Sequence, residues 1–302
     1  MEQVLEILSR GLGFEDILSP PYVLSFIGIA WLVYLLRRER GGFLRWLFPA
    51  DLWRHRSTSA DVWLFVIGRG LAMAGVVSRF GVTPLVATWV AEQVSHGAGL
   101  MPQLGPTALA LLIFVVVDFA NYWVHRIFHR MQVLWPLHAV HHSAEVLTPL
   151  TAYRQHPAAT IVNAVLSTMI LGGVLGLFVG VVTPDTPLAQ IVGVNAFVVV
   201  ANLTLANFHH AHIWLSFGPI LERLIISPAQ HHIHHSIEPR HYNRNYGQFL
   251  ALWDWMFGTL YIVRKHEVMT FGLSGAADAP LMTHRLGPLL FNPLRRMWRP
   301  TR

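Results

Sequence analysis

Residues 138–145 read HAVHHSAE and residues 231–238 read HHIHHSIE, so both stretches fit the pattern H-x-[VI]-H-H-S-x-E. On a helix, histidines at positions i, i+3 and i+4 lie on one face. Two further groups accompany this repeat, a pair four residues apart and a triplet between the repeated stretches: His125 and His129, and His209, His210 and His212. Neutral imidazole is a common ligand for iron, zinc and copper. The pair supplies two imidazoles, and the three histidines that the repeats share supply three in each, which makes eight. One tetrahedral metal uses fewer, so the sequence predicts a site for two metal ions.

The predicted ligands include all eight of these histidines: His125, His129, His138, His141, His142, His231, His234 and His235. A helix would direct His209 and His212 one way and His210 another. One of these three is expected to complete the site, and His210 is favoured. His156 precedes Pro157. It is either a further ligand, a donor to a ligand, or an interfacial histidine before a proline that starts a helix.

Several side chains near the histidine groups are expected to orient the ligands: Asp118, Glu145, His232, Glu238 and Asp254. Metal-bound histidines usually give their second N–H to a carboxylate or a carbonyl. Glu145 and Glu238 occupy the same place in the two repeats, although solvation of a helix or loop would also explain them. Asp118 lies about two helical turns before His125 in an apolar segment, where an ionisable residue is costly. The remaining histidines lack companions at ligand spacing and are interpreted as surface or loop residues: His55, His96, His241, His266 and His284.

The composition indicates an integral membrane protein. Of the 302 residues, 53% are hydrophobic and 13% are charged, whereas soluble domains carry about 25% charged residues. The net charge of +6 comes mostly from arginines beside apolar stretches, with Lys265 the one lysine. It therefore bears on membrane orientation and lipid head groups, and no nucleic-acid partner is expected. The absence of cysteine excludes disulfides, thiolate-bound zinc, iron–sulfur clusters and a catalytic thiol.

Apolar stretches of about 20 residues can cross a bilayer as helices. Five such stretches are predicted to be spans: 18–36, 61–78, 107–124, 160–182 and 188–206. The stretch 83–95 is shorter and is expected to be re-entrant or interfacial. The predicted fold is all-α, an integral membrane helical bundle with a cytosolic helical cap that carries a histidine-ligated dimetal site. We expect an N-terminal membrane region (1–106), a catalytic region (107–265) and a basic C-terminal tail (266–302).

Loop charges predict the orientation, because basic loops stay cytoplasmic. Residues 37–56 hold six arginines, whereas residues 1–17 hold four acidic side chains against one arginine. The N-terminus is therefore expected outside, with the segment 37–60 inside. Alternation of the spans then brings every histidine group to the cytoplasmic face. We expect a multi-pass protein of a bacterial inner membrane with its active site on the cytoplasmic side.

Four stretches carry a resemblance to a known family: DFANYWVHRIFH at 118–129, WPLHAVHHSAE at 135–145, SPAQHHIHHS at 227–236 and NYGQFLALWDWMFGTLY at 245–261. This ordered series is similar to the fatty acid hydroxylase and sterol desaturase superfamily of membrane-bound di-iron enzymes. The resemblance implies two iron ions held mostly by histidines, with zinc as a substitute in purified samples. It carries over the eight ligand positions above, together with His210 and His156.

The same resemblance implies an oxidoreductase that uses O2 to hydroxylate or desaturate a C–H bond of a lipid, sterol or carotenoid. One branch of the superfamily instead cleaves ether lipids with a pterin reductant. The substrate would enter from the bilayer. Electrons would come from a reductase, a ferredoxin, a cytochrome b5-like protein or a small reductant.

Two other classes of function are considered. A zinc-dependent membrane hydrolase acting on a lipid or peptide is the main alternative, since zinc peptidases also use H-x-x-x-H. Their catalytic glutamate is replaced here by Arg126. A metal or proton transporter would place histidines within the spans at mid-membrane depth, but here they gather outside the predicted spans.

Overall fold

The computed structural model describes residues 16–76, 82–94, 105–182, 196–267 and 269–298. These residues form helices joined by irregular segments, with two isolated β-bridges, Ile225 to Leu250 and Ser236 to Phe271. The all-α class is therefore confirmed for the described part of the chain. The α-helices are α2 Pro20–Leu36, α3 Phe43–Leu47, α4 Ala50–Trp53, α5 Arg56–Met73, α6 Thr83–Val94, α7 Pro106–Arg130, α8 Trp135–His142, α9 Pro157–Val182, α11 Ala196–Ala201, α12 Asn207–His209, α13 Gly218–Leu221, α14 Pro228–His235, α15 Leu252–Met256 and α16 Leu286–Trp298. There are also four short 3-10 helices, η1 Pro149–Tyr153, η3 Pro239–His241, η4 Ala276–Asp278 and η5 Leu281–Thr283, and one short π-helix, η2 Asn202–Ala206, among the described residues.

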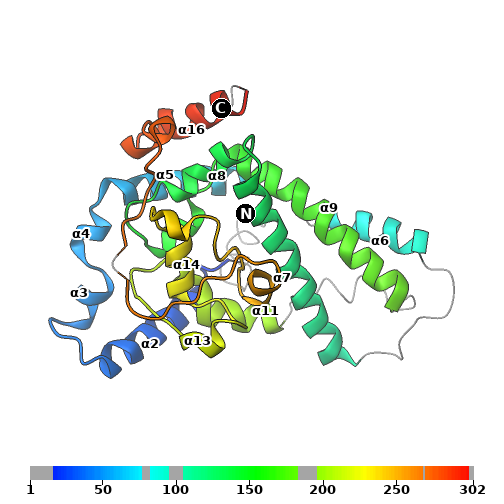
Figure 1. Ribbon diagram of the computed structural model, residues 1–302, viewed down its shortest axis with the longest axis horizontal. Helices are drawn as coiled ribbons and strands as arrows, with labels where there is room; N and C mark the ends of the chain where they lie inside the picture. Colours follow the sequence, from blue (N-terminus) through cyan, green and yellow to red (C-terminus); the bar gives the residue numbers. More distant parts are fainter. Residues whose placement is uncertain (1–15, 77–81, 95–104, 183–195, 268, 299–302) are drawn as a thin grey trace, which may run out of the picture.

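Helices α6, α7 and α9 form an arm on one side of the molecule (Figure 1). Helix α9 has a glycine at every fourth position where it meets α6: Gly172, Gly176 and Gly180. A Cβ atom on Gly176 would lie 2.5 Å from the carbonyl oxygen of Ala87 in α6, so only glycine allows this approach. Small residues at this spacing are typical of closely packed membrane helices. Helix α6, which covers the described part of the short predicted segment, is thus held against a long apolar helix.

In the described part of the chain, two helices are long and apolar enough to cross a membrane, Thr107–Arg130 within α7 and Pro157–Val181 within α9. They contain the third and most of the fourth predicted spans. Helix α2 and the run Ala196–His209 are apolar but shorter. The start of the fifth predicted span and the predicted turn at 183–187 lie outside the described residues.

The second predicted span, 61–78, is not supported in the described residues. Helix α5 covers most of it and carries Arg56, Asp61 and Arg69. Asp61 is fully buried and forms an ion pair of 2.8 Å with the equally buried Arg154, just before α9. Helix α5 is therefore held to the histidine-bearing part of the chain by a buried ion pair, and it also exposes the apolar side chains of Val62, Trp63 and Val66.

The second half of α7 packs against the segment 249–257. The carboxylate of Asp118 accepts hydrogen bonds from the backbone N–H groups of Phe249 and Leu250, at 3.0 and 3.1 Å, and from the indole N–H of Trp253 at 3.0 Å. Buried carboxylates need such donors. Asp118 therefore anchors this loop, which corrects the expectation that it orients a histidine ligand.

The predicted C-terminal tail packs against α8 in its described part. Leu281 and Leu289 are fully buried in a cluster with Ala139 and Val140 of α8. Helix α16 crosses the top of α8 in the view of Figure 1. Residues beyond 265 thus help to fix the helix that carries three of the predicted ligands.

Candidate metal centre

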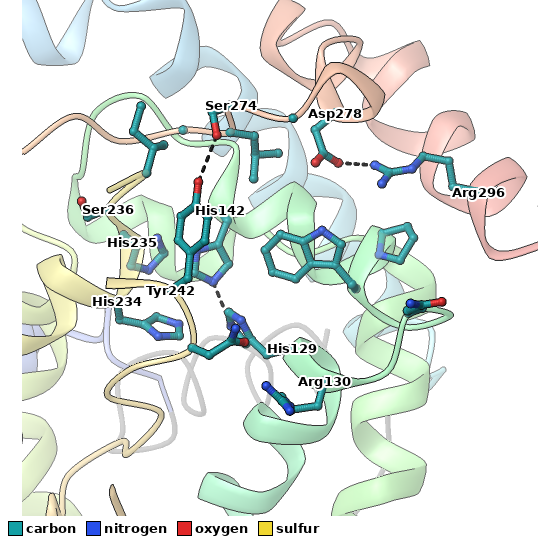
Figure 2. A pocket seen from close by; sticks show the side chains of 18 residues that line it. His129, Arg130, His142, His234, His235, Ser236, Tyr242, Ser274, Asp278 and Arg296 are labelled. Carbon is teal, nitrogen blue, oxygen red and sulfur yellow. Dashed lines mark hydrogen bonds and ion pairs between the residues drawn. The ribbon is translucent and has the colours of Figure 1, made fainter. Parts of the chain in front are cut away.

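A cavity of about 490 Å³ lies between the ends of α7 and α8, helix α14 and the segment 272–278. Figure 2 shows the histidines on its inner wall: His129, His142, His234 and His235. Its outer wall is polar: Tyr242 and Ser274 share a hydrogen bond of 3.0 Å, and Asp278 pairs with Arg296. Trp135, Pro136, Ile237 and Leu273 add apolar surface. The cavity therefore offers both apolar and hydrogen-bonding groups next to the histidines.

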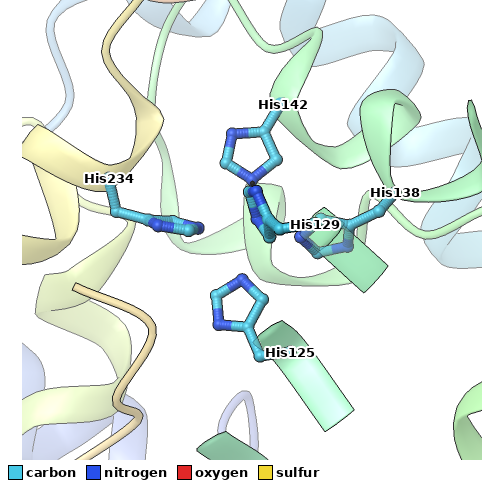
Figure 3. A group of neighbouring side chains, drawn as sticks. All are labelled: His125, His129, His138, His142 and His234. Carbon is cyan, nitrogen blue, oxygen red and sulfur yellow. Dashed lines mark hydrogen bonds between the residues drawn. The ribbon is translucent and has the colours of Figure 1, made fainter. Parts of the chain in front are cut away.

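The histidines gather into two groups, in each of which one ring nitrogen from every histidine lies within 4.8 Å of those of the others. The first group consists of His125, His129, His138, His142 and His234, whose rings point toward one another in Figure 3. The second group consists of His141, His210, His231 and His235. The structure thus brings together nine of the ten histidines that the sequence singled out as ligands.

Each repeated motif contributes to both groups. Helix α8 gives His138 and His142 to the first group and His141 to the second. Helix α14 does the reverse, giving His234 to the first group and His231 and His235 to the second. The C-cap of α14, Ser236, and the proline at its start, Pro228, bound an eight-residue helix, long enough to present all three rings. Two short helices of similar sequence therefore form most of both groups.

The spacing of the nitrogens fits metal coordination. The Nε2 atom of His210 lies 3.2 Å from that of His141 and 3.0 Å from that of His231. In the first group, the Nε2 atoms of His129 and His142 are 3.1 Å apart. Nitrogens bound about 2.0–2.1 Å from one tetrahedral ion lie about 3.3–3.4 Å from each other.

Unpartnered nitrogens give a second indication. The Nε2 atoms of His125, His138 and His234 are buried and have no hydrogen-bond partner among the described residues. A buried polar atom without a partner is costly unless an unseen ligand satisfies it. All three belong to the first group. Both groups therefore suit metal ions in number, distance and chemistry of donors.

Burial keeps these imidazoles in the neutral form. Loss of solvation lowers the pKa of His141 to about 3, with a further contribution from the nearby Arg154 charge. Burial and neighbouring imidazoles also hold the pKa of His142 and His235 well below the usual value. Because metals bind the neutral ring, the groups are already in the ligating form near neutral pH.

Backbone carbonyls orient two members of the first group. The Nδ1–H of His125 donates to the carbonyl of Tyr246 at 2.9 Å, and the Nδ1–H of His234 donates to the carbonyl of Arg244 at 2.8 Å. The carboxylate of Asp254 accepts from the N–H groups of Tyr246 and Gly247, at 2.8 and 2.7 Å. Asp254 is thus linked to His125 through the backbone of Tyr246 and not by direct contact.

Replacing Asp254 with alanine is expected to lower metal affinity about 10–100-fold, the usual cost of losing a group that orients a ligand. The segment carrying the Tyr246 carbonyl would lose two hydrogen bonds, so His125 would no longer be held in one orientation. Titration of the apoprotein with iron or zinc measures the change. Asp278→Ala is the control, since that carboxylate pairs with Arg296. Equal affinity in wild type and Asp254→Ala would contradict this role.

The expectation that His156 is a ligand is corrected. Its Nε2–H donates to the carbonyl of Leu290 at 2.9 Å, and its Nδ1 accepts from the N–H of Ala158 at 3.0 Å. Both ring nitrogens are therefore used at the start of α9. His156 fits the alternative interpretation, a histidine before a proline that starts a helix.

The two repeated glutamates also differ from expectation. Glu145 accepts from Nε2 of His284 at 2.6 Å and lies 3.3 Å from Arg56, so it faces α5 and the C-terminal region. Burial would raise the pKa of Glu145, but His284 and Arg56 together hold it below the usual value. The backbone of Glu238 donates to Ser236 at 3.2 Å. Among the described residues, neither carboxylate contacts a histidine of the two groups.

Three further histidines border the second group without joining it. His209 stacks on His231 with ring centroids 5.0 Å apart, and Nε2 of His212 lies 3.0 Å from the carbonyl of Trp46. Of the triplet, only His210 belongs to a group. His232 is buried beside Trp214 and the backbone of Ala211, which places it between α14 and the triplet, away from the cavity. It can support the position of the triplet but not a ligand ring directly.

Sequence analysis missed the buried network behind α8. Arg154 is fully buried and donates to the carbonyl of Val140 and to Ser143 Oγ, both at 2.8 Å. It also lies 2.9 Å from Nδ1 of His284, which the sequence had suggested was a surface residue. The one sequence feature that pointed to this buried network was the arginine two residues before His156, in the run RQHP at 154–157.

Residues 110–259 match the family model for fatty acid hydroxylase. The chain belongs to the fatty acid hydroxylase superfamily. Among curated proteins, it is 33% identical over 165 residues to an alkylglycerol monooxygenase of Danio rerio, which covers 54% of this chain and 32% of that protein. It is 27% identical over 194 residues to the ornithine lipid hydroxylase of Rhizobium tropici, covering 63% of this chain and 53% of the relative.

A third fatty acid hydroxylase relative is a putative sterol desaturase of Arabidopsis thaliana, 30% identical over 158 residues, with 50% of this chain and 47% of the relative covered. The chain thus spans between about a third and a half of the length of these relatives. No solved structure matches. The matched region includes every histidine of both groups, so the family assignment and the geometry point to the same residues.

Proposed function

We propose that the protein is a membrane-bound di-iron oxygenase that uses O2 and external electrons to hydroxylate or desaturate a C–H bond of a lipid-like substrate. The observation that carries this proposal is the pair of adjacent histidine groups within the family's matched region. The relatives are named as a monooxygenase, a hydroxylase and a desaturase, which supports oxidation of a lipid by this chain.

Iron bound by the two groups would supply the redox chemistry with O2. The first ion would be held by His125, His129, His138, His142 and His234, and the second by His141, His210, His231 and His235. The carbonyls of Tyr246 and Arg244 keep two of these rings in one tautomer. The chain's own contribution is to hold the donors neutral, fix their directions and shield them from water.

The cavity suits an amphipathic substrate. Trp135, Ile237 and Leu273 can contact an apolar chain, while Tyr242 and Ser274 can bind polar groups. A substrate in this cavity would lie against His129 and His142 of the first group and His235 of the second. Its reacting carbon would therefore be presented to both ions.

The proposed location is a membrane, with the metal centre on the cytoplasmic side. The arginine-rich segment 37–56 lies beside the histidines: Arg37 donates to the carbonyl of Trp214, and the carbonyl of Trp46 accepts from His212. Basic segments favour the cytoplasm. This argument needs no span in α5, so it supports the predicted orientation independently of that segment.

A zinc-dependent hydrolase is less well supported. Such an enzyme needs a carboxylate or similar base beside its metal-bound water. Among the residues lining the cavity, Asp278 is the one carboxylate, and it pairs with Arg296. No relative named above is a hydrolase of this kind.

Lipid mass spectrometry tests the function. We expect membranes that contain the iron-loaded protein, a reductant and O2 to accumulate a lipid heavier by one oxygen atom or lighter by two hydrogen atoms. Isotopically heavy O2 should label the oxygenated product. Accumulation of the same product without O2, or of a hydrolysed lipid instead, would contradict the proposal.

A further inference from the structure

A second hollow shares no lining residue with the cavity and is strongly basic. Four cationic side chains border it, Arg240, Arg244, Arg264 and Lys265, together with His266 and one carboxylate, Glu267. Glu267 is nearly buried and pairs with Arg240 at 2.8 Å, whereas the Arg240 side chain is 61% exposed. Arg264 and Lys265 are exposed and have no ion-pair partner among the described residues. The surface of this basic hollow therefore presents positive charge.

The basic hollow is directly connected to the first histidine group. The backbone carbonyl of Arg244 accepts the Nδ1–H of His234 at 2.8 Å. Asn245, the next residue, accepts from the N–H of Tyr261 at 2.7 Å and donates to the carbonyl of Gln230 at 3.1 Å. A single hydrogen bond thus joins the backbone of the hollow at Arg244 to His234, a proposed metal ligand. The two hydrogen bonds of the Asn245 side chain hold the neighbouring backbone in place.

The hollow and the cavity have no lining residue in common. A partner in the hollow would leave the cavity free for substrate. None of the residues lining the hollow is among the exposed large hydrophobic side chains, in contrast to Ile220 and Leu221 of α13, which are 76% and 51% exposed. Segments that insert into a membrane surface combine basic and apolar groups. The hollow itself offers mainly charge, which favours a protein partner over a lipid surface.

We propose that the basic hollow is the docking surface for an acidic, one-electron donor protein, an inference that rests on the proposed oxygenase function. Each hydroxylation would place one atom of O2 in the substrate and reduce the other to water. That reaction consumes two electrons and two protons, so a one-electron donor is oxidised and released twice in each turnover. Complementary charge speeds such short encounters, and salt slows them.

The test uses the full iron-loaded chain and an acidic plant-type [2Fe–2S] ferredoxin as probe. Two rates of product formation are measured. One is driven by reduced ferredoxin, and the other follows reduction of the protein with dithionite under argon, removal of the excess dithionite and addition of O2. The test variant is Arg264→Glu/Lys265→Glu. The control is Arg285→Glu/Arg295→Glu, which reverses two exposed charges outside the hollow. Calorimetric binding of oxidised ferredoxin gives a readout that does not depend on turnover.

We expect the test variant to lose at least about tenfold in the ferredoxin-driven rate at low salt and to bind ferredoxin correspondingly more weakly. Its dithionite-driven rate should equal that of wild type, and the control should resemble wild type in every measurement. Added salt should slow the ferredoxin-driven rate of wild type and of the control, but should have little effect on that of the test variant.

Equal ferredoxin-driven rates in the test variant and wild type would overturn the docking proposal. So would a wild-type protein that turns over with dithionite but not with ferredoxin. If the test variant loses only its binding to phosphatidylglycerol vesicles, the hollow contacts lipid and the proposal fails. Absence of dithionite-driven turnover in wild type would instead count against the oxygenase function on which the inference rests.

Discussion

Replacing His210 with alanine is expected to reduce the metal content of the purified protein from two ions to one. His210 lies in the second group, where its Nε2 is 3.2 Å from that of His141 and 3.0 Å from that of His231. The first group contains none of these three rings and should keep its ion. Product formation should fall by more than about 100-fold, since even groups that only orient ligands contribute about 10–100-fold.

His212→Ala is the matched control, because His212 lies two residues further along the same segment. Its Nε2 lies 3.0 Å from the carbonyl of Trp46, outside both groups. This variant should retain both ions and most of its activity. Metal analysis by mass spectrometry, with product formation measured on the same samples, checks both variants. Full metal content in His210→Ala, or equal loss in the two variants, would refute the assignment.

The helical spacing of the repeats predicted a shared face but not how that face is divided. Successive residues on an α-helix are rotated by about 100°, so His141 and His142 point in clearly different directions. In α8 the residues i and i+4 serve the first group, whereas in α14 they serve the second. Which ring meets which group depends on the packing of α8 against α14 and α7, and no local pattern encodes that packing.

The contacts that hold the histidine rings in place were harder to predict than the two histidine groups themselves. The positions of Asp118, Glu145 and Asp254 near the histidine groups made direct contacts with the grouped histidines plausible. These carboxylates instead bind backbone N–H groups or, for Glu145, His284 outside both groups. The carbonyls of Tyr246 and Arg244 take the place expected for them. Every residue has a carbonyl, so the sequence could not indicate which ones would serve.

Hydropathy predicted the apolar helices α7 and α9 but could not indicate the ion pair that α5 buries. The two partners, Asp61 and Arg154, are 93 positions apart in the chain and meet only in the fold. A window of sequence around Asp61 counts one unfavourable charge in an apolar stretch. It cannot register that a distant guanidinium compensates the charge.

Replacing Arg154 with leucine is expected to lower the free energy of unfolding by about 3–5 kcal/mol, the usual cost of leaving one buried charge without its partner. Asp61 would lose its ion pair, and the carbonyls of Val140 and Ser57 would each lose a donor. Since Val140 lies between His138 and His141, the histidine-bearing helix α8 should loosen with the loss. Denaturant unfolding in detergent, with metal content measured on the same protein, follows both effects.

Two comparisons separate the buried charge from a general loss of packing. Arg56→Leu removes a largely exposed arginine that lies 3.3 Å from Glu145 and should change the free energy of unfolding by no more than about 1 kcal/mol. The double variant Asp61→Leu/Arg154→Leu should be less destabilised than the sum of the two single variants, because no unpaired charge remains buried. Additive losses in the double variant would show that Arg154 stabilises α8 through its hydrogen bonds alone and not by neutralising Asp61.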